Sequence, residues 1–224
     1  MNARAAPIGA VEAIMTTRAM RRFTDDPVDL EVVRTCLAAA QQAPSGGNVQ
    51  PQQYVVLTDD EPKGRIADIY RRSFDRYEAS LPAREFRDES QRAAWERTSA
   101  ASRHLADHLA AAPVIVVFLQ PLMPWGGRDD EGELDIGRLD ASVYPAVQNF
   151  CVAARAHGLG TALTTVIRVH SAEALEVLGV PVDRFEIAAL VPVGVPSGRF
   201  GVAPRRPAGK ATHWNTYGNC EPPN

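Results

Sequence analysis

Three separated segments of the chain carry side chains suited to holding an anion and a flat heterocycle. The first is arginine-rich and spans residues 17–23, the second is a loop of small and amide residues at 43–51, and the third lies near the C-terminus. Arginine forks suit phosphate, and asparagine and glutamine offer donor and acceptor edges to a heterocycle. Glycine beside them allows a backbone to approach a ligand closely. The arginines concerned are Arg18, Arg21, Arg22, Arg205 and Arg206.

Other motifs that carry chemistry are absent or incomplete. No GxxxxGK[ST] sequence is present, so a P-loop is unsupported. The pair Gly158 and Gly160 lacks a third glycine and follows a predicted helix, whereas a dinucleotide-binding turn follows a strand. His104 and His108 form an HxxDH pattern on one helix face, which we interpret as a solvated face rather than a zinc site. We therefore predict no metal.

Composition and charge indicate an ordinary globular protein. The chain has 224 residues, a length that predicts a single domain over 1–224. A net charge of −3 supplies no basic field, which argues against nucleic acid or an anionic membrane as a partner. The 3 cysteines are widely spaced and odd in number, which favours a reduced compartment. With no secretory signal and no membrane span predicted, we expect a cytoplasmic protein.

Hydrophobic periodicity predicts helices alternating with a few strands. Apolar stripes and caps place helices at 8–22, 29–43, 62–80, 83–111, 139–157 and 171–178. Strands are expected at 52–58, 114–119, 161–167 and 185–193. The two helices over 62–111 are heavily charged, so their charged residues are interpreted as a solvated face. Residues 121–137 are expected to form a surface loop that acts as a lid, and 196–224 an extended tail.

Together, and in this order, the segments resemble the FMN-dependent nitroreductase family. The resemblance covers nearly the whole chain and rests most on the APSGGNVQP stretch at 43–51. It also includes the arginine-rich segment before Phe23, the VQNF helix from Val147, the GLGT stretch from Gly158, and the C-terminal arginine pair. The resemblance implies an α+β fold with a mostly antiparallel sheet flanked by helices, in an intertwined homodimer. FMN is the implied bound cofactor, with each site built by two chains at the dimer interface.

The resemblance also implies which residues contact FMN. Arg18, Ala19 and Arg21 match positions that hold the phosphate, the ribityl chain and the N1/O2 edge of the flavin. A second set matches the loop along the isoalloxazine ring: Pro44, Ser45, Gly46, Asn48 and Gln50. A third set matches the segment whose backbone N–H faces flavin N5: Leu163, Thr164 and Thr165. Arg205, with Arg206 beside it, matches a phosphate anchor.

The implied activity is reduction of an electron-poor small molecule. NAD(P)H gives a hydride to FMN and leaves, and a nitroaromatic, quinone or similar acceptor then takes the electrons, which is ping-pong chemistry carried by the cofactor. No side-chain acid or base is required. Gly47 and Trp125 are the expected substrate contacts, with Trp125 able either to stack on a flat substrate or to lie pinned to the surface.

Rival interpretations remain open at this point. Within flavin chemistry the chain is also compatible with a dehalogenase, a flavin-cleaving enzyme or a biosynthetic dehydrogenase. A flavin-binding storage or sensor protein without turnover belongs to a different class. A structural or interaction module that uses the charged helices at 62–111 is the third alternative.

Overall fold

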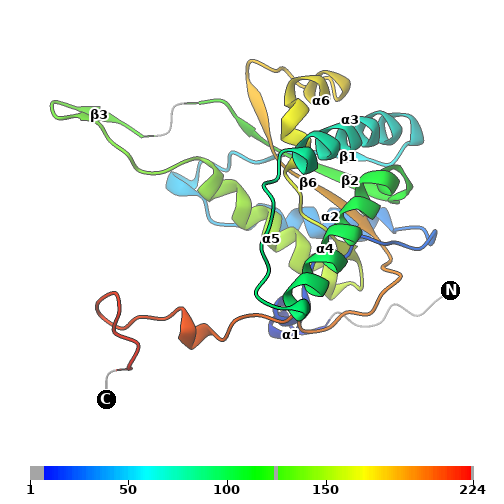
Figure 1. Cartoon of the computed structure of the whole chain (residues 1–224). Helices are drawn as coiled ribbons and strands as arrows, with labels where there is room; N and C mark the ends of the chain where they lie inside the picture. The colour runs from blue at the N-terminus through cyan, green and yellow to red at the C-terminus, as the bar shows by residue number, and fades with distance from the viewer. Residues whose placement is uncertain (1–7, 124–125, 223–224) are drawn as a thin grey trace.

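The central sheet is antiparallel throughout. A computed structural model describes residues 8–123 and 126–222 (Figure 1). Within them the main sheet has the order β1-β2-β6-β5, and all neighbouring strands pair antiparallel. The strands are β1 (Gln53–Leu57), β2 (Val114–Pro121), β5 (Gly160–Thr161) and β6 (Phe185–Gly194). The predicted α+β class with a mostly antiparallel sheet is confirmed.

Helices cover both faces of this sheet because its central strand is apolar on both sides. Alternate residues of β2 pack into different clusters: Val114, Val116 and Phe118 join one face, and Ile115, Val117 and Leu119 join the other. The first cluster includes α2 (Leu30–Gln41) and α5 (Asp140–Ala156). The second includes α3 (Asp60–Ala79), α4 (Glu89–His108) and α6 (Ser171–Val177). Short 3₁₀ turns are η1 (Gly46–Asn48), η2 (Leu109–Ala111), η3 (Val166–His170) and η4 (Ala208–Lys210).

The first predicted helix, 8–22, is too long. Helix α1 covers only Ala10–Thr16, and Thr17 already has an extended backbone. The chain leaves the helix because the following residues pair with the sheet. Ala19 forms a parallel bridge with Thr161, and the N–H of Met20 donates to the Thr161 carbonyl at 2.8 Å. Competition from these tertiary hydrogen bonds ends the helix before its apolar pattern does.

Two further boundaries differ from the sequence prediction. The helix expected over 83–111 begins at Glu89, because the Asp88 side chain caps it by accepting the Gln91 N–H at 2.8 Å. The strand expected over 161–167 pairs regularly only at β5, and the chain turns into η3 at Val166. Between β5 and η3, the backbones of Thr164 and Leu190 form two reciprocal hydrogen bonds of 2.9 Å. These bonds hold residues 162–165 against β6.

Two segments extend away from the layered body (Figure 1). The first contains the short strands β3 (Arg128–Asp129) and β4 (Gly132–Glu133), which form a hairpin within the stretch expected to be a loop. The second is the C-terminal segment after Pro196, whose described part contains only the single turn η4. Trp125 lies outside the described residues. No helix in the described ranges is long and apolar enough to cross a membrane.

Candidate functional site

Two cavities share Leu163 as a lining residue. The arginine cavity, about 270 Å³ in volume, is lined by Thr17, Arg18, Ala19, Gln148, Cys151, Thr161, Leu163 and Arg205. The aromatic cavity is of similar volume, about 270 Å³, and lies between α3, α4 and residues 163–166, with Arg21 on its wall. Leu163 is 40% exposed, although it is apolar. Side chains from both ends of the sequence therefore meet at one face of the fold.

Backbone pairing positions the arginine-rich segment between the two cavities. The segment runs along β5 through the Ala19–Thr161 bridge, and Phe23 then pairs with Pro196. Successive residues of an extended chain point to opposite sides. In this segment Arg18 lines the arginine cavity and Arg21 lines the aromatic cavity.

Two glycines allow this segment to lie close against the sheet. A Cβ at Gly194 would be 2.8 Å from the Phe23 ring, and one at Gly160 would be 2.9 Å from the Met20 Cβ. Real Cβ atoms do not approach neighbours so closely, so a larger residue would displace the segment. Gly158 has a different role, because α5 ends just before it. Its φ of +78° is the left-handed conformation that a glycine adopts after a helix, as its position in the sequence predicts.

The arginine cavity carries uncompensated positive charge. Arg18 and Arg205 both line it, and no Asp or Glu does. Across the described residues neither guanidinium forms an ion pair with a carboxylate, and Arg205 donates only to the carbonyl of Pro204 at 3.3 Å. Gln148 of α5 adds an amide to the same lining. Two guanidiniums with free donor edges beside an amide are suited to a phosphate ester.

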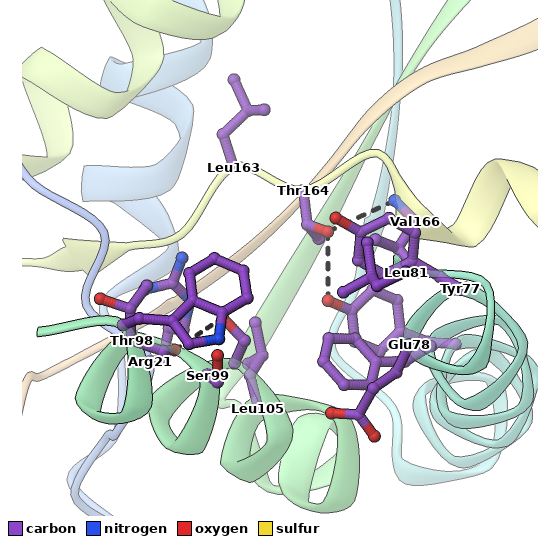
Figure 2. Close-up of a pocket in the computed structure, with 14 residues that line it drawn as sticks. Arg21, Tyr77, Glu78, Leu81, Thr98, Ser99, Leu105, Leu163, Thr164 and Val166 are labelled. Carbon is purple, nitrogen blue, oxygen red and sulfur yellow. Dashed lines mark hydrogen bonds between the residues drawn. The ribbon is translucent and has the colours of Figure 1, made fainter. Parts of the chain in front are cut away.

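Aromatic rings and a small polar patch line the aromatic cavity (Figure 2). Tyr70, Phe74 and Tyr77 reach it from α3, and Trp95 reaches it from α4. The Tyr70 hydroxyl lies 3.1 Å from the Thr164 hydroxyl, which also accepts the Val166 N–H at 3.4 Å. Figure 2 shows Arg21 and Tyr77 approaching from opposite sides, with Thr164 between them. The arrangement suits a flat ring with a polar edge.

Burial affects the two ionisable groups at this patch in opposite directions. Burial raises the pKa of the Tyr70 phenol, while its hydrogen bond with Thr164 and the charge of Arg21 partly offset that rise. Burial lowers the pKa of the Arg21 guanidinium, which remains protonated at neutral pH because an arginine pKa is so high. No carboxylate forms an ion pair with Arg21 in the described ranges. Among the described residues this half-buried positive charge has no carboxylate partner, so it is available to an anionic edge of a ligand.

Arg103 of α4 holds the two helical walls of the aromatic cavity together. Its guanidinium pairs with Asp75 of α3 at 2.6 Å and with Glu78 one turn further on. The same group lies 4.7 Å from the centre of the Phe74 ring. These ion pairs raise the pKa of Arg103 above its ordinary value. Because one guanidinium bridges two carboxylates, it fixes the spacing of α3 and α4.

The loop at 44–50 lines neither the arginine cavity nor the aromatic cavity. Asn48 and Gln50 have left-handed backbones with φ of 55° and 47°, which is unusual for residues other than glycine. The loop is held by the Ser45 hydroxyl, which accepts the Gln50 N–H at 3.0 Å, and by the Gln41 amide, which donates to Gln50 at 3.2 Å. Gly46 also donates its N–H to Ser142 of α5 at 3.1 Å. Local strain at exposed amide residues is typical of a ligand-binding loop.

A family comparison agrees with this arrangement. A profile of the Nitroreductase family matches residues 14–195. Every residue that lines the two cavities falls in this range except Arg205. The chain belongs to the nitroreductase family.

Relatives within this family differ in activity. The chain is 32% identical over 151 residues to a 5,6-dimethylbenzimidazole synthase from Rhodospirillum rubrum, a match that covers 67% of this chain and 65% of the synthase. The match therefore spans less than two thirds of that relative. A shorter match, 43% identical over 49 residues, covers 22% of this chain and 22% of a nitrobenzene nitroreductase from Ectopseudomonas oleovorans.

Solved structures share the nitroreductase fold at low sequence identity. An oxidised iodotyrosine deiodinase bound to FMN and 3-iodo-L-tyrosine superposes with a TM-score of 0.72 at 21% identity, over 93% of this chain and 100% of that chain. An FMN and NADPH-dependent nitroreductase from Sphigopyxis sp. strain HMH gives a TM-score of 0.69 at 20% identity, over 94% and 100% of the two chains. At these identities, the two similarities show that the fold is shared.

The structure brings together part of the site expected from the sequence. One cavity gathers Arg18, Ala19, Leu163 and Arg205, and the other gathers Arg21, Leu163 and Thr164. The remaining described residues of the expected set line neither cavity in the single chain: Pro44, Ser45, Gly46, Gly47, Asn48, Gln50, Thr165 and Arg206. Their roles remain predictions.

Sequence reasoning missed the aromatic wall. Tyr70, Phe74 and Tyr77 follow an i, i+4, i+7 spacing, which places them on one helix face. That spacing was the available signal, but the many charges around it favoured a solvated face. The ion pairs of Arg103 show what several of those charges do, since they join two helices around a cavity.

The histidines at 104 and 108 have a structural explanation. Their rings stack with centroids 4.2 Å apart, and Arg22 lies 2.9 Å from His104 Nδ1. Burial, helped by the charges of Arg22 and His108, lowers the pKa of His104. Nowhere in the described ranges do three His, Cys, Asp or Glu side chains gather as a metal site would need.

Proposed function

We propose that the chain is an FMN-dependent oxidoreductase that uses NAD(P)H to reduce nitroaromatic, quinone or similar electron-poor molecules. The observation that carries this proposal is the convergence of Arg18 and Arg205 on one cavity that adjoins an aromatic one, with no carboxylate partner for either among the described residues. Family membership and the FMN named in structures of similar fold support the same cofactor.

The donor set of the arginine cavity fits the phosphate end of FMN. Arg18 and Arg205 would bind the phosphate, and Gln148 and Thr17 supply further hydrogen-bonding groups. Arg21, half-buried on the wall of the adjoining cavity, would stabilise negative charge at the N1/O2 edge of the flavin. Within residues 163–165, Leu163 or Thr165 would offer a backbone N–H toward N5, because the Thr164 N–H donates to the Leu190 carbonyl. When bound, FMN supplies the capacity to accept a hydride and pass electrons on.

The 44–50 loop is expected to complete the site from a second copy of the chain. Its residues line neither cavity of their own chain, while their amides and strained backbones favour ligand contact. The aromatic cavity would then bind the flat acceptor, with Tyr70 and Thr164 as its polar edge. Gly47 and Trp125 remain proposed substrate contacts. We propose a homodimer that works in the cytoplasm on small molecules.

An absorbance spectrum of the purified protein tests this proposal. We expect a flavin spectrum that anaerobic NAD(P)H bleaches and that a nitroaromatic or quinone restores. A colourless protein that gains no flavin on reconstitution would contradict the proposal and favour an interaction module. A yellow protein that NAD(P)H cannot bleach would favour storage or sensing.

A second candidate is a specialised enzyme of the same family. The 32% identity with a dimethylbenzimidazole synthase supports a flavin-cleaving or other biosynthetic reaction as the alternative to a general reductase. The fold shared with an iodotyrosine deiodinase keeps a dehalogenase among the alternatives. Reduced protein exposed to oxygen distinguishes these outcomes: loss of FMN with formation of dimethylbenzimidazole supports a synthase, whereas intact, reoxidised FMN supports a reductase. Release of iodide from iodotyrosine would support a dehalogenase.

A further inference from the structure

A third cavity continues the aromatic cavity outward. This outer cavity, about 400 Å³ in volume, shares Glu78, Leu81, Trp95 and Ser99 with the aromatic cavity. Its other walls come from the segment between α3 and α4 and from the first half of α4. The two cavities therefore form one elongated cleft, with Arg21 and Thr164 at the inner end and Arg84 at the outer end.

Arg84 stacks on aromatic rings at the outer cavity and has no carboxylate partner in the described part of the chain. The carbon at the centre of its guanidinium lies 4.3 Å from the centre of the Trp95 ring and 5.9 Å from that of Phe86. Stacking occupies the face of a guanidinium and leaves its N–H edges free. No ion pair joins Arg84 to a carboxylate within the described ranges. Its donors are therefore available to a ligand.

Two carboxylates share the outer cavity with Arg84, and neither forms an ion pair with it within the described ranges. Glu78 also lines the outer cavity, but Arg103 already pairs with it. Glu96 is the other carboxylate of the lining, and the ion pair that Arg92 of α4 makes is with Glu89, at 3.5 Å. Arg92 lies 5.3 Å from the centre of the Phe86 ring, the same ring that Arg84 approaches. Of the two guanidiniums that approach this ring, Arg84 lines the outer cavity and Arg92 does not.

We propose that the outer cavity is a subsite for a carboxylate or phosphate group tethered to the flat ring bound in the aromatic cavity. Arg84 recognises the anion and so selects acidic, elongated ligands over neutral ones. The anion has two sources with the same chemistry: an acidic tail on the electron acceptor, or the pyrophosphate of NAD(P)H. The proposal rests on the proposed function, because the ring in the inner cavity is the acceptor or the nicotinamide.

Binding to the oxidised holoprotein tests the subsite without turnover. The probes are 4-phenylbutanoate and its neutral counterpart 4-phenylbutan-1-ol, with dissociation constants measured by calorimetry. The variants are Arg84→Gln and the matched control Arg92→Gln, which removes a neighbouring guanidinium that does not line the cavity. We expect Arg84→Gln to weaken binding of the acid about tenfold and to leave the alcohol unchanged, as loss of one charge-assisted contact predicts. Arg92→Gln should preserve the difference between acid and alcohol.

A second arm identifies the source of the anion. The same variants are titrated with NADP⁺ and with nicotinamide, which lacks phosphate. Weaker binding of NADP⁺ alone to Arg84→Gln assigns the subsite to the dinucleotide, and weaker binding of 4-phenylbutanoate alone assigns it to the acceptor. If Arg84→Gln weakens neither anion, or if Arg92→Gln weakens both equally, the subsite proposal is overturned.

Two controls separate this result from other failures. Arg84→Lys keeps the charge but loses the planar stack, so it should retain more affinity for the acid than Arg84→Gln. Thermal unfolding curves that match the wild type establish that the exposed substitution leaves the fold intact. Failure of the proposed function shows independently, as a flavin that NAD(P)H does not bleach, whereas the subsite is measured on oxidised protein.

Discussion

The arginine cavity and the aromatic cavity share Leu163 yet have opposite character. One offers Arg18 and Arg205 with no acidic neighbour in its lining, and the other offers rings from α3 and α4 with a small polar edge. The first suits a fixed, charged group, because paired guanidiniums bind phosphate with defined geometry. The aromatic cavity suits ligands that exchange, because stacking and burial select for the shape of a ligand more than for one functional group. Under the proposed function, cofactor retention and substrate choice therefore depend on separate segments of the chain.

The largest expected effect comes from removing the charge of the arginine cavity. Arg18→Ala and Arg205→Ala should each weaken FMN binding about 10- to 100-fold, since each loses charge-assisted hydrogen bonds to phosphate. Fluorescence titration of the apoprotein measures this. Arg199→Ala is the control, because this tail arginine lines neither cavity. Equal losses in all three variants would mean that general positive charge, not this cavity, attracts the cofactor.

The sequence predicts the arginine cavity better than the aromatic one for a physical reason. Arg18, Ala19 and Arg205 belong to short local motifs whose residue types already suggest an anion. The aromatic wall has no such motif: Tyr70 and Phe74 become neighbours of Thr164 only when α3 packs across the sheet. Helix ends were also unpredictable where tertiary hydrogen bonds decide them, as at Thr17.

The strand at 114–119 and its burial on both sides could be predicted more readily. The unbroken apolar run at 114–119 predicts a strand buried on both sides, and β2 has that position. The helix expected from residue 29 likewise depends on local chemistry, since the Asp29 side chain caps α2 by accepting the Glu31 N–H at 2.8 Å. Local capping chemistry and strand patterning need no knowledge of distant partners, which is why they could be predicted.

A second prediction concerns the boundary between the two cavities. Replacing Arg21 with Ala should make bound FMN harder to reduce, because a positive charge near the N1/O2 edge stabilises the reduced, negatively charged flavin. The midpoint potential of the bound flavin, measured at saturating FMN, should fall. Arg21→Lys should retain part of the wild-type potential. A potential unchanged in Arg21→Ala would refute this role for Arg21.

A third prediction tests how the sheet holds the segment that separates the cavities. Gly194→Ala places a methyl group 2.8 Å from the Phe23 ring, so it should destabilise the fold by about 1 to 3 kcal/mol and weaken FMN binding. Gly64→Ala in α3 meets no atom within 4 Å and should be neutral or stabilising, by up to about 1 kcal/mol. Chemical denaturation measures both. If Gly194→Ala proved as stable as the wild type, the close packing of Phe23 would not position this segment.

The smallest effect is expected from the link between Arg22 and α4. Burial, Arg22 and His108 lower the pKa of His104 below its ordinary 6.5 in the folded protein, while Asp107 opposes them. Between the lowered pKa and 6.5 the unfolded chain therefore binds more protons, so stability falls as the pH decreases through that window. His104→Gln should flatten this slope in unfolding curves recorded from about pH 7.5 to about pH 5.5. A slope identical to that of the wild type would show that His104 does not contribute to it.

Affinity for FMN compared with riboflavin tests the central claim most directly, because the two ligands differ only in the phosphate. If Arg18 and Arg205 bind that phosphate, the apoprotein should bind FMN at least about 100-fold more tightly than riboflavin. The double variant Arg18→Ala/Arg205→Ala should lose most of that preference while its affinity for riboflavin stays near the wild-type value. Equal affinity of the wild-type protein for FMN and riboflavin would contradict the account.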